Sequence, residues 1–298
     1  MFSSHKTCRV NRVTQKNKIT VPFIRDIIFV KDMRYFFLCF TLLCVGCNVV
    51  PPERIQIFQD AISAYEAGEY RQSAALYEQL VEQGVRSGTV YYNLGNAWAK
   101  TDEPVRAVAA YYLAQRYIPN DPRLNANLRA VLASNGGAPP SSETSLVAYL
   151  FFWQDWVGIN AKIWGSIVFA VLTFLGGVSC GLPGGSRRPA LMRTTIFVTI
   201  LTAIALASTG YDWYRFEAVE RIIVTTNAMP RKGNSEQYEP AFVSPIPFGT
   251  LAVILDERNG WYSLRFSNGQ EGWLPYSQTF RLRYQTEIPR AVAPIENL

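Results

Sequence analysis

Residues 163–182 read IWGSIVFAVLTFLGGVSCGL and residues 194–211 read TTIFVTILTAIALASTGY. Neither apolar stretch contains a charged residue, and each is close to the length of about 20 residues that crosses a hydrocarbon core as a helix. Residues 183–193, between them, carry three arginines together with glycine and proline. Positive charge in a short loop favours the cytoplasmic side. The sequence therefore predicts a two-helix transmembrane hairpin with a cytoplasmic loop.

Aromatic residues flank both stretches where the chain would leave the membrane. They are Trp153, Trp156 and Trp164 near the start of the first and Tyr211, Trp213 and Tyr214 at the end of the second. Such residues gather at membrane–water interfaces, so we expect both clusters at one interface and the rest of the chain outside the cytoplasm. The alternative is a buried helical pair in a soluble protein. That pair would carry a polar stripe, whereas these helices have only scattered serine and threonine.

The basic charge of the chain is concentrated at its N-terminus. Residues 1–46 contain eight basic and two acidic residues, which accounts for the whole formal charge of +6, and the remaining 21 basic and 21 acidic residues balance. No basic excess is left to neutralise phosphates, so composition gives no support for nucleic-acid binding.

Residues 1–46 also contain the parts of an export signal. A basic residue after Met33 precedes an apolar run that ends at Gly46-Cys47. This order is that of a secretory signal, and its ending resembles a bacterial lipobox in which Cys47 becomes lipidated. Translation is then expected to start at Met33. The alternative is an uncleaved anchor helix behind a cytoplasmic tail, because Cys44 stands where a lipobox has an aliphatic residue.

Cysteine and histidine are absent from the globular regions that would be exported. Cys180 lies inside the first apolar stretch, the other cysteines lie in or beside the leader, and His5 is the only histidine. Disulfides, cysteine- or histidine-ligated metal and histidine-based triads are therefore excluded from those regions. The carboxylate pairs at 102–103 and 256–257 are adjacent in loops and would not converge on one substrate. We expect no cofactor, no metal and no enzymatic activity.

Residues 54–134 have the pattern of two helical repeats and a capping helix. The order and spacing of a tetratricopeptide repeat are matched by Tyr91, Leu94, Gly95, Trp98, Ala107, Tyr111, Ala114 and Pro119. A step of about 34 residues toward the N-terminus places Ser73 on Ala107 and Tyr77 on Tyr111, which predicts an earlier, degenerate repeat. Asp121-Pro122 is expected to begin the capping helix. Because about three repeats are usually needed for a stable stack, we expect this helix and a partner or the membrane region to complete the core.

The first helices of the two repeats would line a groove. The candidate binding residues on it are Phe58, Ile62, Tyr65, Tyr92, Asn96 and Lys100. Asn96 and Lys100 lie one helical turn apart and together would hold a carboxylate. The alternative is an ordinary polar face with a solvated lysine. Phe58 and Ile62 are equally suited to the core of the degenerate repeat.

Residues 135–162 connect the repeats to the first transmembrane stretch. Residues 135–142 read NGGAPPSS, which is the composition of a linker. Residues 145–159 are apolar and aromatic but are interrupted by Gln154-Asp155, and an aspartate at mid-membrane costs about 2.5–3.5 kcal/mol. This segment is therefore expected to be an interfacial helix.

Residues 217–285 are expected to form a small β module, with residues 286–298 as a tail. Short β-branched and aromatic runs alternate with turns, and Asn268-Gly269 is the pair preferred in a type I′ hairpin. Counting outward from that turn pairs Leu264 with Trp273, which would place both side chains on one face.

The order of strands and loops in this module resembles a bacterial SH3-like barrel. Trp261 and Trp273 are its candidate binding residues. The alternative is that they close the core, as such residues also do in these barrels.

The order of all these parts resembles the BatE-type proteins of the bacterial Bat aerotolerance systems. The resemblance covers most of residues 47–284 and includes YNLGNA at residues 92–97, FWQ at residues 152–154, and the module segments 256–261 and 269–275. It implies a non-enzymatic membrane component that works beside von Willebrand A-domain Bat proteins and, indirectly, a MoxR-type ATPase.

We therefore expect a multidomain α and β protein with α-helical tetratricopeptide repeats, a two-helix transmembrane hairpin and a small SH3-like β-barrel. Its expected function is that of a membrane-anchored extracytoplasmic scaffold that joins other envelope proteins. Its expected location is the bacterial cell membrane, which is the inner membrane if the cell is Gram-negative. The alternative is a cell-wall-binding module that positions a peptidoglycan-active partner.

Overall fold

A computed structural model describes residues 51–138, 153–181 and 188–282. The expectations for the leader with Met33 and Cys47, for half of the linker and for the C-terminal tail concern residues outside these ranges. Within them lie eight α-helices and one five-stranded antiparallel sheet, so the predicted mixed α and β class is confirmed.

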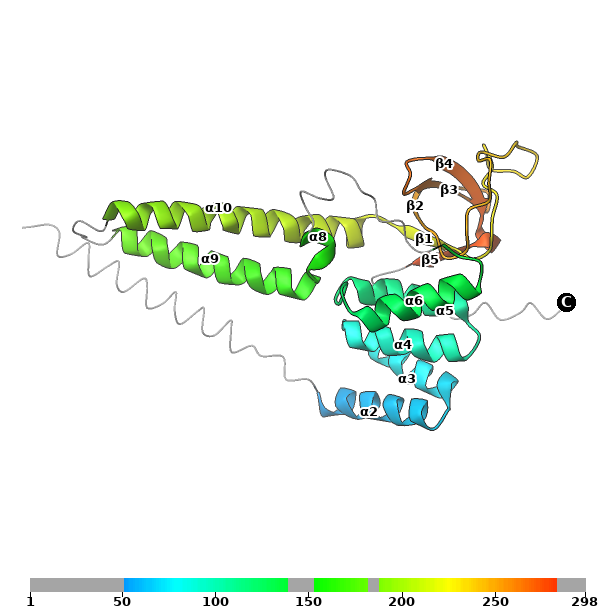
Figure 1. The fold of residues 1–298 in the computed structure, drawn as a ribbon, viewed down its shortest axis with the longest axis horizontal. Helices are drawn as coiled ribbons and strands as arrows, with labels where there is room; N and C mark the ends of the chain where they lie inside the picture. The colour runs from blue at the N-terminus through cyan, green and yellow to red at the C-terminus, as the bar shows by residue number, and fades with distance from the viewer. Residues whose placement is uncertain (1–50, 139–152, 182–187, 283–298) are drawn as a thin grey trace, which may run out of the picture. The chain divides into compact units, whose positions relative to one another are not determined.

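Five α-helices follow one another, and each packs against the next (Figure 1). They are α2 (Pro52–Glu66), α3 (Tyr70–Glu82), α4 (Gly88–Lys100), α5 (Pro104–Gln115) and α6 (Pro122–Ser134). Tyr77, Leu94 and Tyr111 are buried in their common core. α4 and α5 approach closely because Gly95 has no side chain: a Cβ there would lie 2.5 Å from the ring of Tyr111.

The last of these helices begins at a capped turn. Asp121 accepts hydrogen bonds from the backbone N–H groups of Arg123 at 2.8 Å and Leu124 at 3.3 Å. These groups have no partner within the helix, so the cap satisfies them. Leu124, Leu128 and Leu132, one per turn, are buried against the neighbouring helices.

The helical region and the sheet share one hydrophobic core. Ile223, Phe248 and Leu282 of the sheet region belong to the same buried cluster as Val108 and Leu132 of the helices. The Tyr112 hydroxyl also donates a buried hydrogen bond of 2.9 Å to the carbonyl of Gly249. We expected a partner or the membrane region to complete the helical core; within the described residues the sheet contributes most of the added surface, and Phe216, just after α10, also packs on it.

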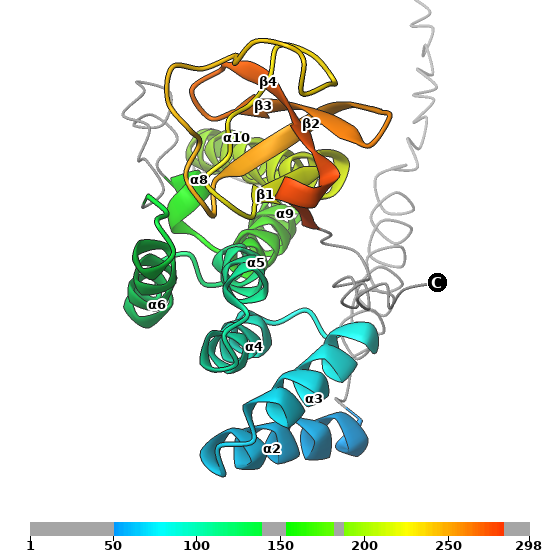
Figure 2. The same cartoon turned by 90° about the vertical axis from the view of Figure 1, so that its right-hand side faces the viewer.

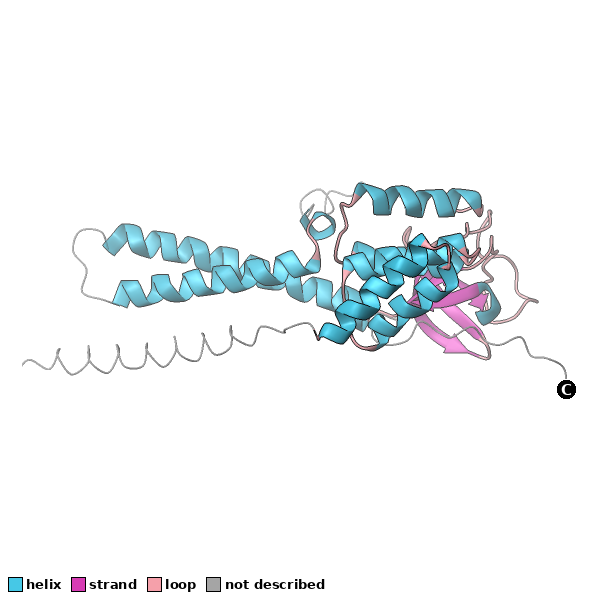
Figure 3. Ribbon diagram, turned by 90° about the horizontal axis from the view of Figure 1, so that it is seen from below, coloured by secondary structure: helices cyan, strands magenta, loops and turns pink. Residues whose placement is uncertain are grey.

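α9 (Ile159–Gly181) and α10 (Arg188–Trp213) lie side by side in opposite directions (Figure 3). Both are long and apolar enough to cross a membrane, and only 6% of the most apolar window of each is buried in protein. The core helices of a soluble protein would be mostly buried. This exposure favours membrane association over the soluble alternative.

Both helices extend beyond the apolar stretches that predicted them. α9 begins at Ile159, which brings Lys162 into its first turn. α10 begins at Arg188 within the expected loop, and it continues into a π-helical turn, Tyr214–Ala218. Helical backbone bonding does not require apolar side chains, so hydropathy alone places such ends too far inward. Of the interfacial helix expected at residues 145–159, the structure describes residues 153–159: α8 (Trp153–Trp156) is helical, the helix stops before Gly158, and Ile159 already begins α9.

The sheet has the strand order β4-β3-β2-β1-β5, with every neighbouring pair antiparallel (Figure 2). Its strands are β1 (Arg221–Val224), β2 (Leu251–Arg258), β3 (Trp261–Phe266), β4 (Glu271–Pro275) and β5 (Thr279–Leu282). The buried face carries Ile222, Leu264 and Leu274. These residues form the centre of a second buried cluster.

The predicted pairing of Leu264 with Trp273 is wrong. Leu264 pairs with Gly272, and Trp273 pairs with Ser263. Gly269 has φ +78°, whereas Asn268 is not among the residues with positive φ. A type I′ turn requires positive φ at both central residues, while a three-residue loop needs it only at the glycine. The register is therefore shifted by one residue, which moves Trp273 to the opposite face.

Candidate functional site

A cleft of about 250 Å³ lies between α2 and α4. Its lining residues are Ile62, Tyr65, Glu66, Tyr77, Asn93 and Asn96. Ile62, Tyr65 and Asn96 are three of the six residues predicted for the groove. They converge here because α2 and α4 present the same face to the cleft, with Tyr77 of α3 behind it.

Asn96 is held in place by two neighbouring side chains. Its Oδ1 accepts hydrogen bonds from the Tyr111 hydroxyl at 2.9 Å and from Asn127 Nδ2 at 2.8 Å. Asn127 Nδ2 also donates to the hydroxyl of Tyr92 at 3.2 Å. The predicted groove residue Tyr92 is therefore part of a network that joins α4 to α6. Burial raises the pKa of Tyr111, so its hydroxyl stays protonated and donates.

Asn93 also lines the cleft but was not among the predicted residues. Its Nδ2 donates to the hydroxyl of Tyr77 at 3.1 Å, and burial raises the pKa of Tyr77. Asn93 precedes Asn96 by three residues, so both lie on one helical face. That spacing is visible in the sequence and would have identified Asn93.

Three predicted groove residues do not line the cleft: Tyr92, which belongs to the network that joins α4 to α6, Phe58 and Lys100. Phe58 packs on the helical core, where its ring lies edge-on to Tyr77 with centroids 5.9 Å apart, in agreement with the core alternative. Lys100 is exposed and lines a different hollow, of about 410 Å³, together with Arg71 and Thr101. Asn96 and Lys100 consequently do not combine into one carboxylate site.

Trp261 and Trp273 lie on the face of the β3–β4 pair opposite the buried one, and both are half-buried. The backbone of Trp273 exchanges two hydrogen bonds with Arg231 of the long β1–β2 loop, at 2.8 and 2.9 Å. On the other face of β3, beside Tyr262, Tyr276 donates to Glu257 at 2.6 Å, and this hydrogen bond raises the pKa of Tyr276 to about 12. The face that carries Trp261 and Trp273 is aromatic and partly accessible.

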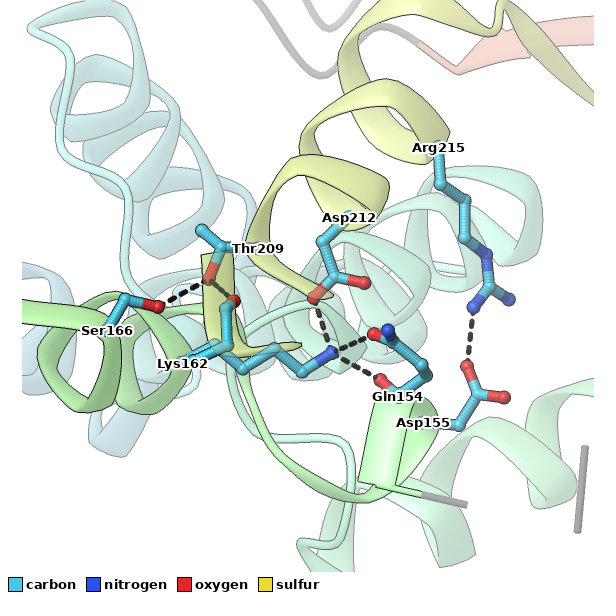
Figure 4. A network of polar contacts seen from close by, with 8 residues as sticks. Gln154, Asp155, Lys162, Ser166, Thr209, Asp212 and Arg215 are labelled. Carbon is cyan, nitrogen blue, oxygen red and sulfur yellow. Dashed lines mark hydrogen bonds and ion pairs between the residues drawn. The ribbon is translucent and has the colours of Figure 1, made fainter. Parts of the chain in front are cut away.

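A buried polar cluster lies where α8, α9 and α10 meet (Figure 4). Lys162 Nζ lies 2.5 Å from Asp212 Oδ2, and the two residues are 7% and 3% exposed. Nζ also donates to the backbone oxygen of Gln154 at 2.7 Å and to its Oε1 at 2.8 Å. Arg215 pairs with Asp155 at 2.5 Å on the outer side of the cluster. Sequence reasoning missed Lys162 and Asp212, although each borders an apolar run.

The base of the hairpin is also bonded to the C-terminal end of α5, at its C-cap residue Arg116. The Ile159 N–H donates to the carbonyl of Arg116 at 3.1 Å, and Arg116 Nη1 lies 2.7 Å from Glu217 Oε1. Arg116 thus contacts the residue that begins α9 and a residue that follows α10. Its guanidinium also lies over the ring of Phe216, 5.1 Å from the centroid.

In the residues that the structure describes, no group of three or more histidine, cysteine, aspartate or glutamate side chains is placed to hold a metal ion. Comparison of the chain with family models, with characterised proteins and with solved structures finds no match. The candidate sites therefore rest on their own geometry.

Proposed function

We propose that the chain is a membrane-anchored scaffold of the BatE type, whose helical region holds a segment of another envelope protein. The observation that supports this function best is the cleft between α2 and α4, in which two asparagine amides lie beside an apolar side chain and a tyrosine ring. Such a surface suits recognition of a polypeptide.

The two asparagine side chains of the cleft use different amide atoms for internal hydrogen bonds. Asn93 uses its Nδ2 and Asn96 its Oδ1 for internal hydrogen bonds. No other described residue hydrogen-bonds Asn93 Oδ1 or Asn96 Nδ2, which leaves one acceptor and one donor, three residues apart on one face. A backbone peptide group offers the complementary N–H and C=O, so the pair fits the main chain of a bound segment.

The other lining residues suggest the side chains of that segment. Ile62 and Tyr65 offer apolar and aromatic surface, which dominates the energetics of most interfaces. Glu66 is exposed at the rim and would attract a basic residue. We therefore propose an extended segment with an apolar residue next to a basic one, belonging to an envelope membrane protein such as a von Willebrand A-domain Bat protein.

The remaining parts of the proposal concern architecture and location. The five helices are proposed to be two tetratricopeptide repeats with a cap, and the sheet an SH3-like barrel. Both would lie outside the cytoplasm, with Cys47 lipidated and the loop near Arg188 in the cytoplasm. The basic residues at the start of α10 and the exposed aromatic residues at its end support this orientation.

Capture of partners from membranes tests the function. Tagged full-length protein is extracted with mild detergent, and the proteins retained with it are quantified. Tyr65→Ala is expected to cost about 2 kcal/mol of binding, some thirtyfold in affinity, and Glu66→Lys should also release the partner. The matched control is Glu53→Lys, the same charge reversal at an exposed residue of α2 outside the cleft. If both cleft variants are folded and retain as much of the partner protein as the parent, the cleft does not bind that partner.

The second candidate function is cell-wall binding through the sheet. Trp261 and Trp273 favour it, because both are partly accessible on one face and aromatic surfaces of this kind stack on sugars and peptides. Full-length protein should then bind purified sacculi saturably, and Trp261→Ala with Trp273→Ala should abolish this binding. Absence of sacculus binding by the unaltered protein would eliminate this candidate.

A further inference from the structure

The contact between α9 and α10 contains a seam of polar side chains. Ser166 Oγ lies 3.1 Å from Thr209 Oγ1, and Thr173 Oγ1 lies 2.8 Å from Thr202 Oγ1. Farther along, Cys180 Sγ lies 3.6 Å from Thr195 Oγ1. Hydrogen bonds of this type hold helices together in a membrane, where no hydrophobic effect acts between them.

The seam repeats with the same period on both helices. Residues 166, 173 and 180 on α9 face residues 209, 202 and 195 on α10. Each step is one heptad, so sliding one helix by about 10 Å brings the polar groups back into contact. Ser166 would then face Thr202, and Thr173 would face Thr195. The slipped register keeps two of the three polar contacts, so the seam favours close packing but separates the two registers by only one contact, that of Cys180.

The Lys162–Asp212 pair at the base of the hairpin favours the observed register over the slipped one. Lys162 is buried and has its acidic partner only in the observed register. A slide of one heptad would place Lys162 beside Ala205, and a buried charge without a partner is costly. Gln154 reinforces the observed register, because it accepts two hydrogen bonds from Nζ (Figure 4).

The pair is not the arrangement that stability alone would select. The second oxygen of Asp212, Oδ1, is buried, and no donor in the described parts of the chain reaches it. Buried ion pairs are often no more stabilising than apolar residues of similar size, and their best-attested role is to specify one arrangement over others.

We propose that Lys162 and Asp212 are the residues that fix the register of the transmembrane hairpin. The register has a consequence beyond the hairpin, because a heptad slide would draw Glu217 away from Arg116, the C-cap residue of α5. The pair therefore maintains the attachment of the helical region to the base of the hairpin. This role does not depend on which ligand the cleft binds.

Two disulfide reporters distinguish the registers in full-length protein in native membranes. Thr173→Cys with Thr202→Cys reports the observed register, and Thr173→Cys with Thr195→Cys reports the slipped one, both in a Cys180→Ser background. After mild oxidation, the linked peptides are identified and quantified by mass spectrometry. In the protein with Lys162 and Asp212 intact, the first reporter is expected to crosslink strongly and the second weakly.

Replacing both charges, Lys162→Leu with Asp212→Leu, should raise the slipped product at least about tenfold and lower the native product, because a slide no longer leaves a lone charge. Lys162→Arg keeps a cation beside Asp212 and should preserve the native pattern. A merely structural role would lower both products together, and that result would overturn the proposal. So would a native pattern in the double-leucine variant, which would point to the close contact of Gly176 with Thr195 as the register determinant.

Discussion

Helices α5 and α10 are both rich in apolar residues, yet they bury opposite kinds of side chain. In α5 every residue from Ala107 to Ala114 is buried. In α10 the buried residues are Thr202, Ser208 and Asp212, while large apolar residues such as Phe197 are exposed. A helix in water hides its apolar side chains, and a helix in lipid can expose them and turn its polar ones toward a neighbour. The difference favours membrane association of the hairpin.

The largest effect is expected in the core around α5. Tyr111 is 1% exposed, fills the space against Gly95 and donates to Asn96. Tyr111→Ala should therefore destabilise the helical region by about 3–5 kcal/mol, the usual cost of removing a buried aromatic ring. Denaturant unfolding of the detergent-solubilised chain, followed by circular dichroism, measures it. A cost below about 1 kcal/mol would show that α5 is not a core helix.

The next prediction tests the exposed side of α10. Phe197 is 62% exposed, and a lysine there should cost about 2.5–3.5 kcal/mol of membrane insertion if lipid covers this face. Phe197→Lys should thus lower the fraction of chain that resists carbonate extraction, whereas Phe197→Leu should not. If the lysine variant inserts and accumulates like the parent, water rather than lipid surrounds this face.

A smaller effect is expected where the helical region meets the sheet. Tyr112→Phe removes the buried hydrogen bond to Gly249 and leaves the carbonyl without its donor, at a cost of about 1–3 kcal/mol. Tyr70→Phe is the control, since the Tyr70 hydroxyl has no hydrogen bond within the described residues. Separate unfolding transitions for helices and sheet in the parent protein would contradict the shared core.

The smallest effect is expected at Glu78. Burial raises the pKa of its carboxyl group, and the positive charge of Arg106, 3.9 Å away, partly offsets that increase. Because the folded state binds this proton more tightly than the unfolded state, the parent gains stability as pH falls through the folded pKa. Glu78→Gln should therefore be slightly more stable than the parent near pH 7, and the difference should vanish below about pH 4. A destabilised glutamine variant at pH 7 would mean that the attraction of Arg106 exceeds the cost of burial.

The apolar helices and the helical region could be predicted because their signals are local. An uncharged run of suitable length and a repeated spacing of large and small residues each lie within one segment. The partial success at the cleft has the same origin, since Ile62, Tyr65 and Asn96 follow helical periodicity.

The features that sequence reasoning missed depend on distant partners. Lys162 meets Asp212 across the two helices, and Tyr112 meets Gly249 across the shared core. In both pairs, the sequence around one residue contains nothing that indicates its partner. The predicted β3–β4 register was wrong for another reason. An Asn-Gly pair fits both a two-residue loop and a three-residue loop with glycine in the left-handed region.

The most direct test of the central claim, that the hairpin spans a membrane with both globular regions outside the cytoplasm, is the activity of alkaline phosphatase fused at three positions. The enzyme folds only after export, so fusions after Ala138 and after Leu298 should be active. A fusion after Gly185 should be inactive, because positive charge in a short loop favours the cytoplasmic side. Activity at Gly185 together with inactivity at Ala138 and Leu298 would contradict the account.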